Sequence, residues 1–82
     1  MSVTVYSQPA CPQCRATYRA LDRQGTPYTV IDLSADPHAL DMVKALGHRQ
    51  APVVVTEADH WSGFRPDKIA GLASLADQRV AA

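Results

Sequence analysis

The chain has 82 residues, which is enough for one small domain and too few for a second hydrophobic core. Its 8 basic and 8 acidic residues cancel, so net charge favours neither a nucleic-acid-binding nor a membrane-binding surface. No apolar run approaches the ~20 residues of a transmembrane helix, and the first residues lack the basic and apolar regions of a signal peptide. We therefore expect a single domain over residues 1–82, located in the cytoplasm.

The first part of the chain alternates strand and helix patterns. Residues 3–6 are mostly β-branched or aromatic, which predicts a strand buried on both faces. Pro12 suits the first position of a helix, and Gly25 is a typical residue to follow its end near residue 24. Residues 28–33 then predict a second strand. The expected inner face of the helix carries Cys14, Thr17, Tyr18 and Leu21.

A second helix has a strong start signal. Asp36 is a favourable N-cap residue and Pro37 suits the first helical position, while Gly47 is expected to end the helix. The spacing of its apolar residues predicts an inner stripe facing the core. This stripe consists of Leu40, Val43 and Leu46.

The last third of the chain predicts a hairpin followed by a helix. Strands are expected at residues 53–55 and 60–62, joined by a polar turn, and Pro66 starts the last helix. Residues 77–82 are expected to fray. The expected inward-facing residues of this helix are Ile69, Leu72, Ala73 and Ala76.

The predicted order of elements is β-α-β-α-β-β-α. A strand–helix–strand unit of this length implies a parallel pair joined by a right-handed crossover. We therefore predict an α/β domain with a four-stranded mixed sheet and three helices that cover both of its faces. This is the thioredoxin-like architecture at the size of a glutaredoxin.

The only two cysteines are Cys11 and Cys14, separated by Pro12 and Gln13. A disulfide between them would be a poor structural staple, because a ring of about four residues adds roughly 2 kcal/mol against about 3 for a fifteen-residue loop. A reducing cytosol would also tend to keep it open. The pair is therefore interpreted as a redox-active dithiol.

The two cysteines are expected to have different roles. Cys11 lies at the N-terminal edge of the predicted helix, where free N–H groups and the helix dipole favour a thiolate. Cysteines in such settings have pKa values lowered to about 3.5–7.5. Cys14, one turn further, should be less exposed, so Cys11 is predicted to attack a substrate disulfide and Cys14 to resolve the mixed disulfide.

A zinc site is the first alternative, because zinc modules also use paired cysteines. Zinc normally needs four ligands, supplied by a second cysteine pair or by closely spaced histidines. The three histidines, His38, His48 and His60, are isolated in the sequence and match no zinc-finger spacing. We therefore expect no metal site.

Pro52 is the second diagnostic residue. It stands between Ala51 and the apolar run at 53–55, far in sequence from the cysteines. This context predicts a cis Ala51–Pro52 bond facing the dithiol, although cis bonds are only about 5–6% of X–Pro bonds. The Ala51 backbone would then be free to pair with an extended substrate segment.

The third feature is the segment from Trp61 through Ser62, Gly63, Phe64 and Arg65 to Asp67. Its two large aromatic side chains are either ordinary core residues or, if exposed near the dithiol, an apolar docking patch. Arg65 and Asp67 are expected to pair and to support the loop before the last helix.

Together these motifs resemble the NrdH-redoxins, glutaredoxin-like bacterial proteins with thioredoxin-like behaviour, and most of all their actinobacterial members. The resemblance spans residue 3 to about residue 76 and rests on residues 11–14, 51–53 and 61–67. It implies that electrons pass from NADPH through thioredoxin reductase to this protein, and then to the large subunit of a class Ib ribonucleotide reductase. It further implies Cys11 as nucleophile and Cys14 as resolving cysteine. We expect no bound cofactor and a monomer, with strand exchange at the hinge before Pro52 as the alternative.

A glutathione-dependent glutaredoxin is the main alternative within this class. Such proteins resemble the chain in size, but they usually carry a basic residue shortly before the cysteine pair and a glycine pair after the fourth strand. Residues 7–10 supply no positive charge, and Ser62-Gly63 is not a glycine pair. A carrier of an iron–sulfur cluster is less favoured, because such carriers usually have a single active-site cysteine.

Overall fold

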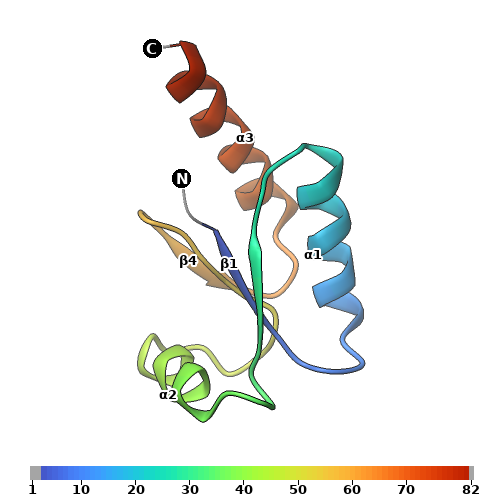
Figure 1. The fold of residues 1–82 in the computed structure, drawn as a ribbon, viewed down its shortest axis with the longest axis vertical. Helices are drawn as coiled ribbons and strands as arrows, with labels where there is room; N and C mark the ends of the chain where they lie inside the picture. The colour runs from blue at the N-terminus through green and yellow to red at the C-terminus, as the bar shows by residue number, and fades with distance from the viewer. Residues whose placement is uncertain (1–2, 82) are drawn as a thin grey trace.

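Four strands and three helices follow one another in the predicted order (Figure 1). The computed structural model describes residues 3–81, with side chains described through residue 73. The elements are β1 (Thr4–Ser7), α1 (Pro12–Arg23), β2 (Thr29–Asp32), α2 (Pro37–Ala45), β3 (Val53–Val55), β4 (His60–Ser62) and α3 (Pro66–Ala81). No helix in the described part of the chain is long and apolar enough to cross a membrane.

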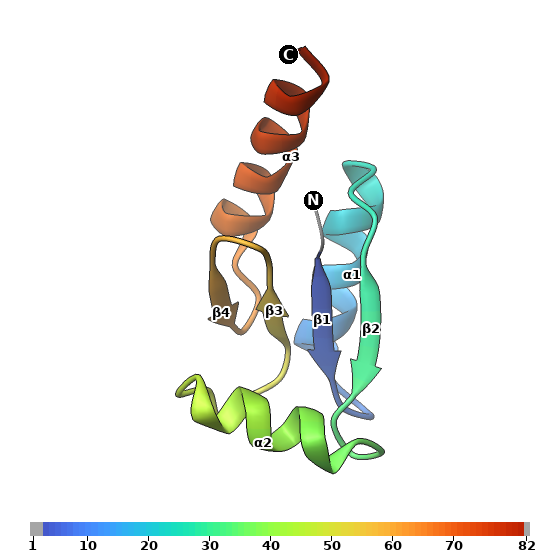
Figure 2. The same ribbon diagram turned by 60° about the vertical axis from the view of Figure 1, so that its left-hand side comes forward.

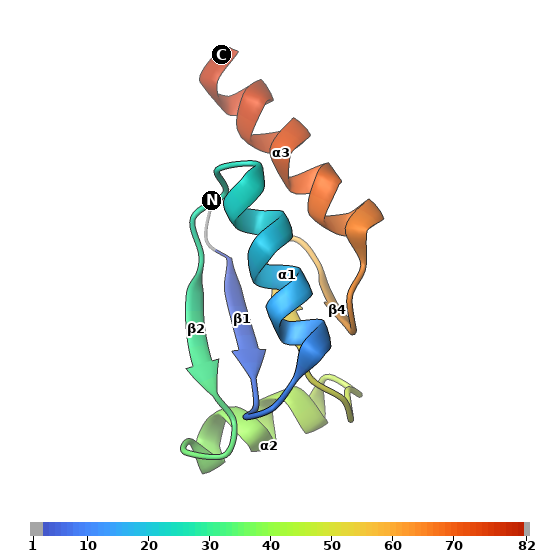
Figure 3. The same cartoon turned by 90° about the vertical axis from the view of Figure 1, so that its right-hand side faces the viewer.

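The strands form one mixed sheet in the order β2-β1-β3-β4. β1 and β2 are parallel, as the predicted crossover requires, and β3 is antiparallel to both β1 and β4. α1 and α3 lie on one face of this sheet, while α2 crosses the other face beside the carboxyl ends of β1 and β2 (Figures 2 and 3). This is the predicted thioredoxin-like arrangement.

Residues of β1 alternate between two hydrophobic clusters, one on each face of the sheet. Val5 packs under α1 and α3, in a cluster with Val3, Leu21, Val54, Trp61, Ile69 and Leu72. Tyr6 packs under α2, in a cluster with Leu33, Ala39, Val43 and Val53. A strand buried on both faces needs apolar residues at successive positions, and this explains the unbroken run at the start of the chain.

The helix boundaries follow the predicted capping residues. The Asp36 side chain accepts a hydrogen bond from the Ala39 N–H at 3.1 Å, with Pro37 as the first residue of α2. Gly25 and Gly47 follow the ends of α1 and α2 with φ of 75° and 92°. This left-handed backbone carries little steric cost only for glycine, so both residues end their helices as expected.

Two details of the helices differ from the sequence prediction. Leu46 is 37% exposed, whereas Ala39 is buried. The reason is that α2 ends at Ala45, so Leu46 lies at the C-cap and no longer follows the helical stripe. α3 runs to Ala81, and the side chain of Ala76, which was expected to face inward, lies outside the described part. Ala82 also lies outside the described residues, and fraying of 77–82 stays a prediction.

A candidate redox-active dithiol site

Cys11 and Cys14 are joined by a disulfide at the start of α1, with their Cα atoms 5.2 Å apart. Cys11 is the N-cap residue, and its Sγ accepts a hydrogen bond from the Cys14 N–H at 3.1 Å. Cys11 is 8% exposed and Cys14 is 2% exposed, so Cys14 is the less accessible of the two, as predicted. The Cys11–Cys14 disulfide can therefore form and break within the first turn of α1.

The loop between β1 and α1 brings Cys11 to the helix N-terminus. β1 ends at Ser7 and α1 starts at Pro12, so a short connection must reverse the chain. Ala10, the residue before Cys11, has φ of 54°, a left-handed conformation that costs an ordinary residue roughly 1–2 kcal/mol. The position of Cys11 at the N-cap is thus set by a tight turn.

The disulfide lies in an open groove of about 350 Å³. Four residues predicted for the site line this groove, namely Cys11, Pro12, Gln13 and Ala51. Sequence reasoning missed the other four, which are Gln8, Ala10, Arg49 and Gln50. Arg49 gives the groove a positive charge. The only sign in the sequence that Arg49 belongs to the site is its position shortly before Ala51 and Pro52.

A second hollow, of about 220 Å³, adjoins the groove and shares Gln8, Arg49, Gln50 and Ala51 with it. Its floor is apolar and its rim carries Lys44 beside Arg49. The apolar lining residues are Leu33, Leu40, Val43 and Val53.

The Ala51–Pro52 peptide bond is cis, which confirms the sequence prediction. Pro52 is buried, and its carbonyl oxygen accepts a hydrogen bond from the Gly63 N–H at 2.8 Å. This bond connects the proline loop to the segment that follows β4. The loop that contains Pro52 is therefore connected to the loop between β4 and α3, and both loops lie beside α1.

Gln13 links the dithiol helix to the same segment. Its Oε1 accepts a hydrogen bond from the Phe64 N–H at 3.2 Å, although the residues are 51 positions apart. A Cβ added at Gly63, where φ is 79°, would lie 3.2 Å from this Oε1. Glycine is thus favoured there by the backbone conformation, and a side chain at this position would also displace the Gln13 amide by a few tenths of an ångström.

The two aromatic residues of this segment have different environments. Phe64 is 39% exposed beside the site, whereas Trp61 is 5% exposed and belongs to the core cluster beneath α1 and α3. Of the two alternatives that the sequence left open, Trp61 is therefore the ordinary core residue and Phe64 is the exposed aromatic. The register of the sheet explains this, because Trp61 pairs with Val54 and points with it into the core.

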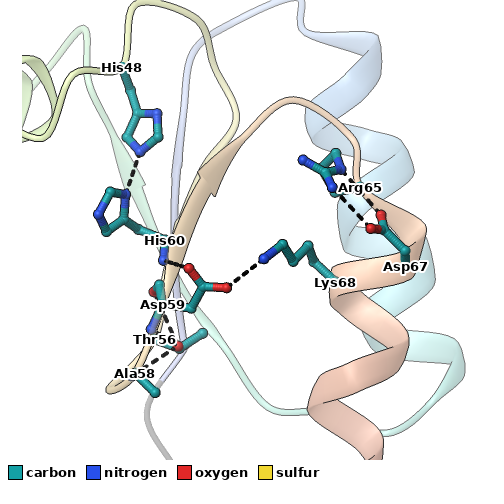
Figure 4. A network of polar contacts seen from close by, with 8 residues as sticks. All are labelled: His48, Thr56, Ala58, Asp59, His60, Arg65, Asp67 and Lys68. Carbon is teal, nitrogen blue, oxygen red and sulfur yellow. Dashed lines mark hydrogen bonds and ion pairs between the residues drawn. The ribbon is translucent and has the colours of Figure 1, made fainter.

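Ion pairs hold the start of α3 (Figure 4). Arg65 pairs with Asp67 at 2.9 Å, as predicted, and Lys68 pairs with Asp59 at 2.8 Å. The hydrogen bond from Arg65 lowers the pKa of Asp67 below its ordinary value. The Lys68 amine also lies 6.0 Å from the centroid of the Trp61 ring.

No group of three or more histidine, cysteine or acidic side chains within the described residues is arranged to hold a metal ion. Two of the three histidines are nevertheless not isolated, contrary to the sequence analysis. His48 and His60 are hydrogen-bonded to each other, because the chain after α2 passes close to the start of β4. Residues twelve positions apart gave no sequence signal of this contact.

Comparison with known proteins decides the family. The glutaredoxin family model matches residues 3–61, from β1 through the start of β4. The chain belongs to the glutaredoxin family.

Within the glutaredoxin family, the chain belongs to the NrdH group. It is 44% identical to the glutaredoxin-like protein NrdH of Salmonella typhimurium, over 84% of this chain and 85% of that protein. It is 35% identical to the NrdH protein of Lactococcus lactis, over 87% of this chain and 99% of that protein. The solved NrdH-redoxin of Escherichia coli superposes with a TM-score of 0.86 at 42% identity, covering 88% and 95% of the two chains.

Proposed function

We propose that this glutaredoxin-family protein is a dithiol–disulfide oxidoreductase that carries electrons from thioredoxin reductase to a class Ib ribonucleotide reductase. The observation that carries the proposal is the position of Cys11 as N-cap of α1, with its Sγ 3.1 Å from the Cys14 N–H. The same N–H and the helix dipole would stabilise a thiolate at Cys11 in the reduced protein.

The reaction transfers two electrons in two exchange steps. The Cys11 thiolate attacks one sulfur of the partner's disulfide, which forms a mixed disulfide and releases the partner's other sulfur as a thiolate. Cys14 then attacks the Cys11 sulfur, which forms the Cys11–Cys14 disulfide and releases the partner's second thiol. The partner has gained two electrons and this protein has lost them.

Thioredoxin reductase would restore the dithiol by the reverse exchange, with NADPH as the source of electrons. NADPH would thus be used indirectly, and we propose no bound cofactor for this chain. Support comes from the NrdH relatives and from the Escherichia coli protein, which is described as having a thioredoxin-like activity profile. We place this exchange in the cytoplasm and treat the protein as a monomer.

The groove supplies the docking surface in this proposal. An extended segment of the partner would lie over the disulfide between Gln13 and Ala51, with Pro52 beneath it and Phe64 exposed at one side. Ser62 and Gly63 shape the loop that presents Phe64, and the Arg65–Asp67 pair supports it. Trp61 supports the same loop from inside the core.

A glutathione-dependent glutaredoxin is the second candidate, and one observation favours it. Arg49 lines the groove of the disulfide and could pair with a carboxylate of the tripeptide, although residues 7–10 carry no positive charge. A single cation leaves the other carboxylate of glutathione without a charged partner in the lining of this groove. We therefore rank this candidate second.

One assay separates the two candidates. NADPH oxidation is followed with thioredoxin reductase and, separately, with glutathione plus glutathione reductase, using a small disulfide as the final acceptor. We expect turnover with thioredoxin reductase, and turnover with glutathione alone would overturn the proposal. Deoxyribonucleotide formation by a class Ib ribonucleotide reductase, with this protein as the only dithiol, then tests the acceptor.

A further inference from the structure

His48 and His60 form a pair of imidazoles on the surface, and neither of them lines the disulfide groove. The Nε2 atom of His48 and the Nδ1 atom of His60 are 2.7 Å apart, and the ring planes are inclined by 81° (Figure 4). His48 follows α2 and is half-buried, whereas His60 is the first residue of β4 and is exposed. Two segments that are distant in sequence therefore bring two ring nitrogens into direct contact.

We propose that these two nitrogens form a binding site for a divalent transition-metal ion, with Cu²⁺ as the preferred ion. Neutral imidazole nitrogen is a good ligand for copper, zinc and nickel, and affinity for a given nitrogen site is generally highest for Cu²⁺. In the hydrogen-bonded pair, one of the two facing nitrogens carries a proton. A shift of that proton to the far nitrogen of the same ring frees both lone pairs without a net loss of protons.

The observed 2.7 Å contact is a hydrogen bond, in which the lone pair of one nitrogen points at the N–H of the other ring. A bound ion would replace this hydrogen bond, with both rings turned so that their lone pairs point at the ion. Square-planar or tetragonal coordination is typical of Cu²⁺, whereas Zn²⁺ prefers a tetrahedron.

The charged groups beside the histidine pair do not supply a third metal ligand. Asp59 directly precedes His60, but both of its carboxylate oxygens are already used. Its Oδ1 accepts a hydrogen bond from the His60 backbone N–H at 2.8 Å, and its Oδ2 accepts one from Lys68 at 2.8 Å. No third histidine, cysteine or acidic side chain in the described part joins the pair to complete a metal cluster. Water would therefore complete the coordination shell.

The site would connect to the disulfide groove through the backbone. His48 is followed directly by Arg49 and Gln50, which line the groove, and it contributes to the adjoining apolar hollow itself. A metal ion held by His48 and His60 would tie this wall of the groove to β4. The proposal is independent of the proposed redox function, because it uses neither cysteine.

The test is a titration of the oxidised protein with Cu²⁺, since the Cys11–Cys14 disulfide leaves no thiolate to compete. Isothermal calorimetry measures the affinity, and electron paramagnetic resonance reports the number of nitrogen ligands. We expect His48→Gln and His60→Gln each to weaken binding at least about tenfold and to reduce the nitrogen signal. The matched control is His38→Gln, which changes the third histidine, an exposed residue in the first turn of α2.

Two results would overturn the proposal. One is an affinity in His48→Gln or His60→Gln equal to that of His38→Gln, because copper would then bind elsewhere. The other is tighter binding of Zn²⁺ than of Cu²⁺, which would contradict the proposed preference for Cu²⁺. Circular dichroism of each variant confirms that it is folded, and a rise in melting temperature with Cu²⁺, lost in the two pair variants, gives a second readout.

Discussion

Cys11 and Cys14 are three residues apart, and their environments divide the chemistry between them. Cys11 caps the helix and reaches the groove, whereas Cys14 lies one turn deeper and is 2% exposed. We predict that Cys11→Ser abolishes disulfide reduction, because the remaining thiol, Cys14, is buried and does not line the groove where the first attack takes place.

Cys14→Ser has a different expected outcome, because the first step remains possible and the second does not. This variant should accumulate a covalent mixed disulfide with its protein partner through Cys11. Non-reducing electrophoresis and mass spectrometry of the trapped species measure it. Full dithiol activity in Cys11→Ser, or a trapped adduct linked through Cys14, would contradict the assigned roles.

Gln13 gives a second prediction at the residue scale. Its side chain is the acceptor for the Phe64 N–H, so Gln13→Ala should expose that amide to solvent. A hydrogen bond with a net worth of about 0.5–1.5 kcal/mol corresponds to an exchange rate about 2- to 10-fold faster. Amide hydrogen exchange measured by NMR tests this.

The matched control for Gln13→Ala is Gln50→Ala. Gln50 lines the same groove, but it makes no contact with the Phe64 loop among the hydrogen bonds of the described residues. The Phe64 amide should exchange in this variant as in the parent protein. Equal exchange in both variants and the parent would show that Gln13 does not hold the loop.

Features that depend on residues close together in the sequence were predictable, whereas contacts between distant segments were not. The lower exposure of Cys14, the cis bond at Pro52 and the Arg65–Asp67 pair all follow from residues within a few positions of one another. The Gln13–Phe64 bond joins residues 51 positions apart, and it depends on how the loop before α3 settles beside α1. No local sequence pattern predicts a contact between residues so far apart in the chain.

At the scale of elements, Gln24 joins the end of α1 to α3. Its Nε2 donates to the Ile69 carbonyl oxygen at 2.7 Å and to the Thr26 hydroxyl at 2.9 Å. Loss of these bonds in a half-buried place should lower the free energy of unfolding by about 1–2 kcal/mol in Gln24→Ala. Urea denaturation measures this value.

Arg19→Ala is the control for Gln24→Ala, because Arg19 is an exposed residue of the same helix. Its free energy of unfolding should stay within about 0.5 kcal/mol of the parent value. If Gln24→Ala changes stability as little as Arg19→Ala does, the connection between α1 and α3 rests on hydrophobic packing alone.

The Asp59–Lys68 pair joins β4 to α3 and gives a pH dependence. The hydrogen bond from Lys68 lowers the pKa of Asp59, so the folded state favours the ionised carboxylate. This stabilisation is present above the unfolded pKa, about 3.9, and is lost as pH falls through the lower folded pKa. Asp59→Asn should therefore be slightly less stable than the parent at neutral pH, with a gap that narrows in acid.

Thermal melts between neutral pH and acid measure this gap. Asp41→Asn, at an exposed position of α2, is the control and should follow the parent curve at all pH values. A gap between Asp59→Asn and the parent that widens in acid would contradict the sign derived from the lowered pKa.

Element boundaries were predictable where a side chain sets them and were missed elsewhere. Pro12, Asp36, Pro37 and Pro66 mark helix starts in the sequence and in the structure. Leu46 was placed on the inner stripe by spacing alone, but the helix ends one residue before it. Apolar spacing therefore indicates a face only as far as the helix itself continues.

At the scale of the whole molecule, a mixed sheet and helices on both faces followed from chain order and crossover handedness. The position of β1 and β3 at the centre of the sheet is an outcome of packing. Both central strands contribute to the two hydrophobic clusters, so neither cluster is complete without the sheet. We therefore expect the domain to unfold as one cooperative unit.

Val53 and Val54 test this cooperativity, because these neighbours are 1% and 0% exposed and point into opposite clusters. Each substitution, Val53→Ala and Val54→Ala, should lower the free energy of unfolding by about 1–3 kcal/mol without changing the urea m-value. Trp61 lies in the cluster of Val54, so its fluorescence reports that side of the sheet, while far-UV circular dichroism reports all of it. The two signals should give the same urea midpoint in both variants, since one sheet supports both clusters. A Trp61 midpoint that stays unchanged in Val53→Ala while the circular dichroism midpoint falls would show that the two clusters unfold separately.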